Sequence, residues 1–176
     1  MRSVLTLCLT LAFTTPVFAQ QSEGAEPPMT LNRMAEILTI LDPDVQFGPN
    51  QVELTIADIP VLIVVDVAAD RMRAMVPIRN AEGMTEDEIM RVLQANFDTA
   101  LDARYAVAHG KLWATYIHPL SPLEREQLIS GLAQTVNIAQ TYGGLYSGGA
   151  AQFGNGDSTD LQRQLIEDLL NKGQEL

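Results

Sequence analysis

The chain has 176 residues, of which 22 are acidic and 11 basic, so its formal net charge is −11. This length predicts one domain with accessory segments, and a hydrophobic content of 47% can supply a real core. The negative charge argues against nucleic acid and anionic membrane surfaces as partners. A basic partner fits the charge, although solubility explains the acidity equally well.

The first 19 residues have the pattern of a secretory signal peptide. Arg2 supplies a minimal basic region, an apolar run follows, and residues 17–19 form a small-residue cleavage site. We expect cleavage after Ala19, export across the inner membrane and a periplasmic location, with no membrane span in the mature chain. Cleavage leaves 10 basic residues against 22 acidic ones, a net charge of −12. It also removes Cys8, the only cysteine, so the mature chain has no disulfide and no thiolate metal site.

Composition divides the rest of the chain into four parts. We expect a disordered leader over residues 20–29, an α+β domain over residues 30–142 and a Gly-rich linker over residues 143–156. Residues 157–176 predict a C-terminal amphipathic helix. This helix is short for an isolated one, so it needs a surface to lie on.

Residues 52–78 predict the centre of the fold, an antiparallel meander. Residues 52–56 alternate between apolar and polar side chains, which is typical of a strand with one wet face. Residues 61–65 are apolar throughout and rich in β-branched side chains, so they fit a central strand that is covered on both faces. We expect a break over residues 58–60 and a further strand over residues 72–78.

Two helices are predicted by their N-terminal caps. Thr30 can cap an opening helix, which ends before Pro43, and a short strand follows over residues 45–47. Thr85 and Glu88 form a capping box for a second helix that runs to about residue 104. The side chains of this second helix that we expect to face the core are Ile89, Leu93, Phe97, Ala100 and Leu101.

A hairpin and a third helix complete the domain. The turn at residues 109–111 joins two strands. Ser121 and Glu124 form a second capping box, which opens a helix that the glycines after Tyr142 stop. The apolar side of this helix consists of Leu128, Leu132, Val136 and Ala139.

No motif carries the signature of a catalytic, cofactor or metal site, so we expect none of these. His109 and His118 lie at opposite ends of one predicted strand, about 20 Å apart, without ligand spacing. Residues 42–53 resemble a calcium loop at three positions, but Phe47 stands where that loop needs glycine. A carboxylate pair for acid–base catalysis stays open, because 22 acidic residues always offer pairs.

The helices of the domain can cover only one face of the predicted sheet. The other face therefore needs a second subunit, a client segment or the C-terminal helix. On the hairpin, Trp113 and Tyr116 point to opposite faces, so one of them should lie on the uncovered face. The partner-binding candidates are Leu62, Val64 and Trp113 on the sheet, and Leu161, Leu165 and Leu169 on the C-terminal helix.

The order of the elements resembles the α+β fold of type III secretion chaperone-like proteins, and in particular the YbjN-like sensory transduction regulator group. The segments that carry this resemblance are residues 34–41, 52–67, 73–78 and 103–116, and the similarity spans residues 30–142. The resemblance implies an antiparallel sheet packed by three helices, and a binding protein, often dimeric, without catalytic residues or cofactors.

We therefore expect a non-enzymatic, periplasmic protein-binding or chaperone-like module that uses the second face of its sheet. Its partner is a protein or peptide, with a second copy of the chain among the candidates. One alternative is a sensor or inhibitor module that is gated by its C-terminal helix. Another is a hydrolase that uses carboxylates, for which a deep pocket with converging acidic side chains would be the sign.

Overall fold

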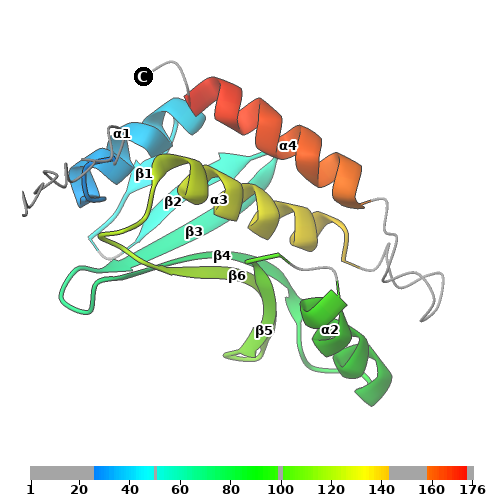
Figure 1. Cartoon of the computed structure of the whole chain (residues 1–176). Helices are drawn as coiled ribbons and strands as arrows, with labels where there is room; N and C mark the ends of the chain where they lie inside the picture. Colours follow the sequence, from blue (N-terminus) through cyan, green and yellow to red (C-terminus); the bar gives the residue numbers. More distant parts are fainter. Residues whose placement is uncertain (1–25, 50, 99–100, 143–157, 174–176) are drawn as a thin grey trace, which may run out of the picture.

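The computed structural model describes residues 26–49, 51–98, 101–142 and 158–173. Within these ranges the chain forms four helices and six strands (Figure 1). Their bounds are α1 Leu31–Leu41, β1 Gln46–Phe47, β2 Val52–Ile56, β3 Ile59–Asp66, β4 Arg71–Asn80, α2 Glu86–Asp98, β5 Arg104–Ala108, β6 Lys111–Pro119, α3 Arg125–Gln140 and α4 Ser158–Gly173.

The six strands form one antiparallel sheet in the order β1-β2-β3-β4-β6-β5. A meander and a hairpin make up this sheet, so the predicted α+β class is confirmed. The pairing of Val61 with Leu54 sets one face of the sheet, which we call the front. Leu62 pairs with Met75 on the opposite face, which we call the back.

Helices α1, α3 and α4 lie on the front of the sheet, and α3 lies between the sheet and α4 (Figure 1). On the sheet side of α3, Gly131 lets the ring of Tyr116 approach so closely that a Cβ at residue 131 would lie 2.4 Å from the Cε1 atom of the tyrosine. On the side of α4, Gly173 meets Ile129 in the same way, with 2.5 Å between such a Cβ and the Cδ1 atom. Helix α3 is therefore buried on two opposite sides.

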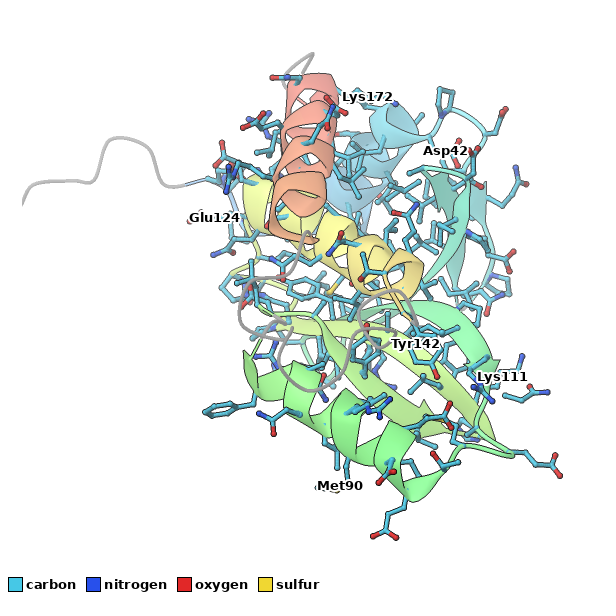
Figure 2. All side chains as sticks on the ribbon, turned by 90° about the vertical axis from the view of Figure 1, so that its right-hand side faces the viewer. Asp42, Met90, Lys111, Glu124, Tyr142 and Lys172 are labelled. Carbon is cyan, nitrogen blue, oxygen red and sulfur yellow. The ribbon has the colours of Figure 1, made fainter. Side chains whose placement is uncertain are left out.

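A polar side chain occupies backbone groups at each edge of the sheet. At one end of the sheet, where β2 extends past the two residues of the edge strand β1, Asp42 accepts a hydrogen bond of 2.7 Å from the backbone N–H of Thr55; Figure 2 labels Asp42. At the β5 edge, the side-chain amide of Asn96 donates to the carbonyl of Tyr105 at 3.1 Å and accepts from its N–H at 2.7 Å. An exposed edge invites another strand to pair with it. Here a partner strand would find these groups already used, which favours binding through the faces.

The predicted caps of the first two helices are confirmed. Thr30 accepts a hydrogen bond of 3.2 Å from the N–H of Arg33 at the start of α1. Thr85 and Glu88 form a reciprocal box before α2, with distances of 2.7 and 3.2 Å. Both caps rest on residues within one turn of each other, which is why the sequence alone reveals them.

The predicted cap of the third helix is wrong. Helix α3 begins at Arg125, and Glu124 forms the capping box with Gln127. The N–H and the hydroxyl of Ser121 instead donate to the carboxylate of Asp70, at 2.7 and 2.9 Å. A contact between distant segments thus replaces the local cap.

The predicted break between the second and third strands is present, but it lies at residues 57–58 and not over residues 58–60. Ala57 and Asp58 have φ angles of 49° and 64°, which is the geometry of a two-residue hairpin turn. Strand β3 then starts at Ile59 and includes Pro60. The proline is tolerated because the ladder between β3 and β4 begins only at Leu62.

The ordered domain begins before residue 30, where the leader was expected to continue. Met29 is 2% exposed and donates its N–H to the carbonyl of Ser121 at 3.0 Å. Glu26 accepts from the N–H of Arg125 at 2.9 Å and pairs with Arg33, and these contacts lower the pKa of Glu26 despite its partial burial. The expected signal peptide, the first residues of the leader and the Gly-rich linker lie outside the described residues.

Candidate functional site

Helix α2 carries an apolar stripe on its solvent side. Ile89, Met90, Leu93 and Phe97 are 41%, 58%, 55% and 87% exposed. Their spacing puts them on one side of the helix, and Figure 2 shows Met90 on the side that faces away from the sheet. Contiguous exposed apolar side chains of this size mark an interaction surface on soluble proteins. We call these four residues the α2 stripe.

The prediction that this side of the helix faces the core is therefore wrong. Leu101, also expected in the core, lies beyond the end of α2 and is 58% exposed, while Ala100 lies outside the described residues. The side chains that pack inward are smaller ones, Val92 at 5% and Ala95 at 1% exposed. Hydrophobic periodicity identified the stripe correctly, but it does not tell which neighbour covers a stripe.

A narrow set of contacts attaches α2 to the sheet. Besides Val92 and Ala95, Asn96 binds the backbone of Tyr105 through both ends of its amide. Arg79 lies 3.5 Å from Glu88 at the first turn, but this ion pair is exposed and contributes little. The helix is thus held by one side, and the α2 stripe stays available.

The back of the sheet is a mixed surface. Leu62 is half-buried, and Val64 and Ile117 are 37% and 53% exposed. Arg73 lies between Val64 and Ile117 in the register, with Arg71 two residues away on the same face. Helices α1, α3 and α4 are all on the front, so none of them covers this face (Figure 1). In the described part of the chain these three helices leave Val64 and Ile117 exposed on the back, but this face is less apolar than the run of residues 61–65 indicates.

Trp113 is the aromatic residue of the hairpin that lies on the back. Its indole N–H donates to the carbonyl of Ala108 at 2.9 Å, and the ammonium group of Lys111 lies 5.9 Å from the ring centroid. Tyr116 occupies the front and is 5% exposed. The sheet candidates Leu62, Val64 and Trp113 therefore share one face, where a partner can reach them.

The leucines of the C-terminal helix belong to the core instead. Leu169 is 5% exposed and Leu165 is half-buried, and both pack with the core of the domain. The side chain of Leu161 lies outside the described part of the chain. Because α4 packs on α3 and α1, it is not the cover of the back, and its buried leucines present no free surface.

A cleft of about 490 Å³ lies between β6 and the start of α3. Asp102, Glu124 and Glu126 line it together with Arg104 and His118. The three carboxylates are exposed to solvent, whereas a carboxyl group that works as a general acid is usually buried. The cleft therefore gives the hydrolase alternative no support. The sequence does not reveal this cleft, because its residues come from three separate segments.

The described ranges hold neither a cluster of metal ligands nor a helix that could span a membrane. Nowhere in them do three His, Cys, Asp or Glu side chains gather where one metal ion could bind. None of the helices in these ranges is both long enough and apolar enough to cross a membrane.

Comparisons with known proteins give a distant likeness in structure. No family model matches the chain, and no curated protein matches it in sequence. The chain is similar to a protein in the crystal structure of the Yersinia pestis type III secretion chaperone SycH in complex with a stable fragment of YscM2. The TM-score is 0.44 at 15% identity, and the match covers 60% of this chain and 98% of that chain. A likeness of this degree supports no functional conclusion, and the kinship with the YbjN-like group stays a prediction.

Proposed function

We propose that this chain is a non-enzymatic protein-binding module whose partner covers the α2 stripe and the back of the sheet. The observation that carries this proposal is the exposure of four large apolar side chains along one side of α2. Burial of apolar surface contributes about 25 cal/mol per Å², so covering the stripe favours association. The edges of the sheet offer less, because Asp42 and Asn96 occupy backbone groups there.

A second copy of the chain is the first partner to test. In each copy the α2 stripe follows the acidic side chains Glu86 and Asp87, and the back of the sheet carries Arg71 and Arg73. A twofold arrangement of two copies can place each acidic helix end near an arginine pair of the other copy. Such opposite charges favour the encounter and set its orientation.

We further propose that the protein acts in the periplasm. The support is the pattern of residues 1–19, with a basic start, an apolar run and a small-residue cleavage site. Cell fractionation followed by N-terminal sequencing tests this. A mature protein that starts at Gln20 in the periplasmic fraction is expected, and an intact Met1 in the cytosol would contradict the proposal.

Charged substitutions on the two surfaces test the binding role. Phe97→Asp and the double variant Leu62→Asp/Val64→Asp each place a carboxylate where a partner would bury it. We expect self-association or partner capture to weaken by about tenfold or more, because a buried unpaired charge is strongly unfavourable. Phe97 is 87% exposed, so its substitution should leave the fold intact.

Light scattering and affinity capture from a periplasmic extract are the measurements. Leu31→Asp is the matched control, because Leu31 is a 51% exposed apolar residue on α1, outside both surfaces. A wild-type chain that neither self-associates nor captures a protein would overturn the proposal. Equal behaviour of the Phe97 and Leu31 variants would do the same.

The sensor alternative, in which the C-terminal helix docks reversibly, has no observation in its favour. Leu169 is 5% exposed within the core, and Gly173 is in contact with Ile129 of α3. Both contacts make α4 a part of the folded domain.

A further inference from the structure

The hydroxyl group of Tyr116 opens into the cleft at the start of α3 without a partner. The residue is 5% exposed and lines the cleft. Gly131 encloses one side of its ring, and His118 stacks on it with 5.9 Å between the ring centroids. Among the residues that the structure describes, none forms a hydrogen bond with this hydroxyl. The oxygen of this otherwise buried residue is not fully enclosed by protein, because the side chain lines the cleft, so a ligand in the cleft can supply its hydrogen-bond partner.

Two donor groups of the cleft already have partners within the domain. A guanidinium nitrogen of Arg104 donates to the carbonyls of Leu101 and Ala103, the latter at 2.8 Å. The Nδ1 atom of His118 lies 2.8 Å from the carbonyl of Pro119 and must donate to it, because a carbonyl only accepts. In the neutral ring this leaves Nε2 as an acceptor.

Two carboxylates of the cleft keep free acceptor positions. Glu126 is exposed, and its carboxylate has no hydrogen bond to any described residue. Asp102 accepts one bond of 3.2 Å from Gln134 and faces the cleft with its negative charge. Burial, with the charge of Asp102, raises the pKa of Tyr116 to about 12. The phenol therefore keeps its proton at neutral pH, and its oxygen can still accept.

We propose that this cleft binds a guanidinium or ammonium group carried on a carbon chain. Three carboxylates face one guanidinium group there, so a cation is favoured over an anion. A volume of about 490 Å³ accommodates an arginine or lysine side chain with its neighbouring backbone. This site is separate from the α2 stripe, so it does not rest on the function proposed above.

The probe for this site is N-acetyl-arginine methylamide, with N-acetyl-citrulline methylamide as its uncharged counterpart of nearly the same shape. Isothermal titration of the full mature chain measures both. We expect the arginine compound to bind saturably and the citrulline compound to bind about tenfold more weakly or not at all, because charge-assisted hydrogen bonds are the stronger ones.

Variants of the lining residues place the binding in this cleft. Glu126→Gln removes a free carboxylate, and Tyr116→Phe removes only the hydroxyl while the ring still packs against Gly131. We expect each to weaken binding of the arginine compound by about three- to tenfold. Glu36→Gln, an exposed acid on α1, is the matched control and should leave binding unchanged. Glu126→Gln decides the question if the tyrosine variant fails to fold.

A comparison with spermidine distinguishes the two sources of such a group. Tighter binding of the arginine compound indicates a basic side chain of a protein, and tighter binding of spermidine indicates a free amine; either result supports the site. Equal affinity for the arginine and citrulline compounds overturns it. Binding that neither Glu126→Gln nor Tyr116→Phe weakens, or no saturable binding, overturns it too.

Discussion

Helices α3 and α2 are both amphipathic in sequence, yet they bury very different parts of their surface. Residues 131–138 of α3 are all buried, with the sheet on one side and α4 on the other. In α2, only Val92 and Ala95 are fully buried among the described side chains, and the larger apolar residues lie in water. The apolar side chains of α3 belong to the core of the domain, whereas the larger apolar side chains of α2 are exposed and available to a partner.

The two helices also differ in the polarity of the side chains that they bury and expose. Gln134 on α3 is 3% exposed, and its side-chain oxygen accepts from the N–H groups of Asp102 and Ala103 at 2.7 and 3.2 Å. It therefore fixes the segment between α2 and β5 from inside the domain. Phe97 on α2, a larger and apolar side chain, is 87% exposed. Position between the layers, more than polarity, decides what this domain buries.

Alanine substitution of one leucine on each helix gives the largest expected difference. Leu132 is fully buried on α3, so Leu132→Ala should lower the free energy of unfolding by about 3 kcal/mol through lost burial and a cavity. Leu93→Ala on α2 should change it by less than about 0.5 kcal/mol in the monomer, because Leu93 is 55% exposed. Urea unfolding at low protein concentration measures both. Similar losses in the two variants would abolish the contrast between the helices.

Removal of the amide that attaches α2 to the sheet should have an intermediate effect. Asn96→Ala leaves the N–H and the carbonyl of Tyr105 without their side-chain partners. We expect a loss of about 1 to 2 kcal/mol in the free energy of unfolding. Hydrogen exchange of the Tyr105 amide should also become faster. An unchanged exchange rate of the Tyr105 amide in the Asn96→Ala variant would mean that other contacts hold α2 at this edge of the sheet.

The smallest expected effect concerns the segment that leads into α3. Hydrogen bonds from the N–H and the hydroxyl of Ser121 hold the pKa of Asp70 below its usual range. A lowered pKa stabilises the fold above the pKa of the unfolded chain, about 3.9 for Asp, and this contribution is lost as pH falls through the lower folded value. Asp70→Asn should therefore make the stability less sensitive to acid.

Asp58→Asn is the matched control for that experiment. Asp58 and Asp70 both have positive φ angles, 64° and 52°, which asparagine tolerates. The difference between the two pH profiles thus reports the contacts with Ser121. Identical profiles for Asp70→Asn and the wild-type chain would show that these contacts do not contribute in solution.

Local signals allowed much of the fold to be predicted. The alternation of residues 52–56, the caps at Thr30 and Thr85 and the turn at His109 all depend on neighbours in the chain. Ser121 shows the limit of such local signals. Its sequence pattern also predicts a helix cap, but its N–H and hydroxyl donate to the carboxylate of Asp70, which lies 51 residues away in the chain. Contacts of this length are not encoded in a capping pattern.

The candidate sites were harder to predict from the sequence than the fold was. The α2 stripe has the periodicity of a core face, and only the three-dimensional structure shows that its four side chains are exposed among the described residues. Leu169 illustrates the reverse case, since its stripe looked available for a partner but packs in the core. The face of a helix follows from its periodicity, whereas its cover depends on the whole arrangement.

Site-specific photo-crosslinking in cells tests most directly whether something covers the α2 stripe. A photoreactive amino acid is placed at position 97, or at position 31 as the exposed apolar control on α1. We expect position 97 to give a discrete protein adduct, either a second copy of the chain or another protein, and position 31 to give none. The absence of an adduct at position 97, or equal adducts at both positions, would contradict the account.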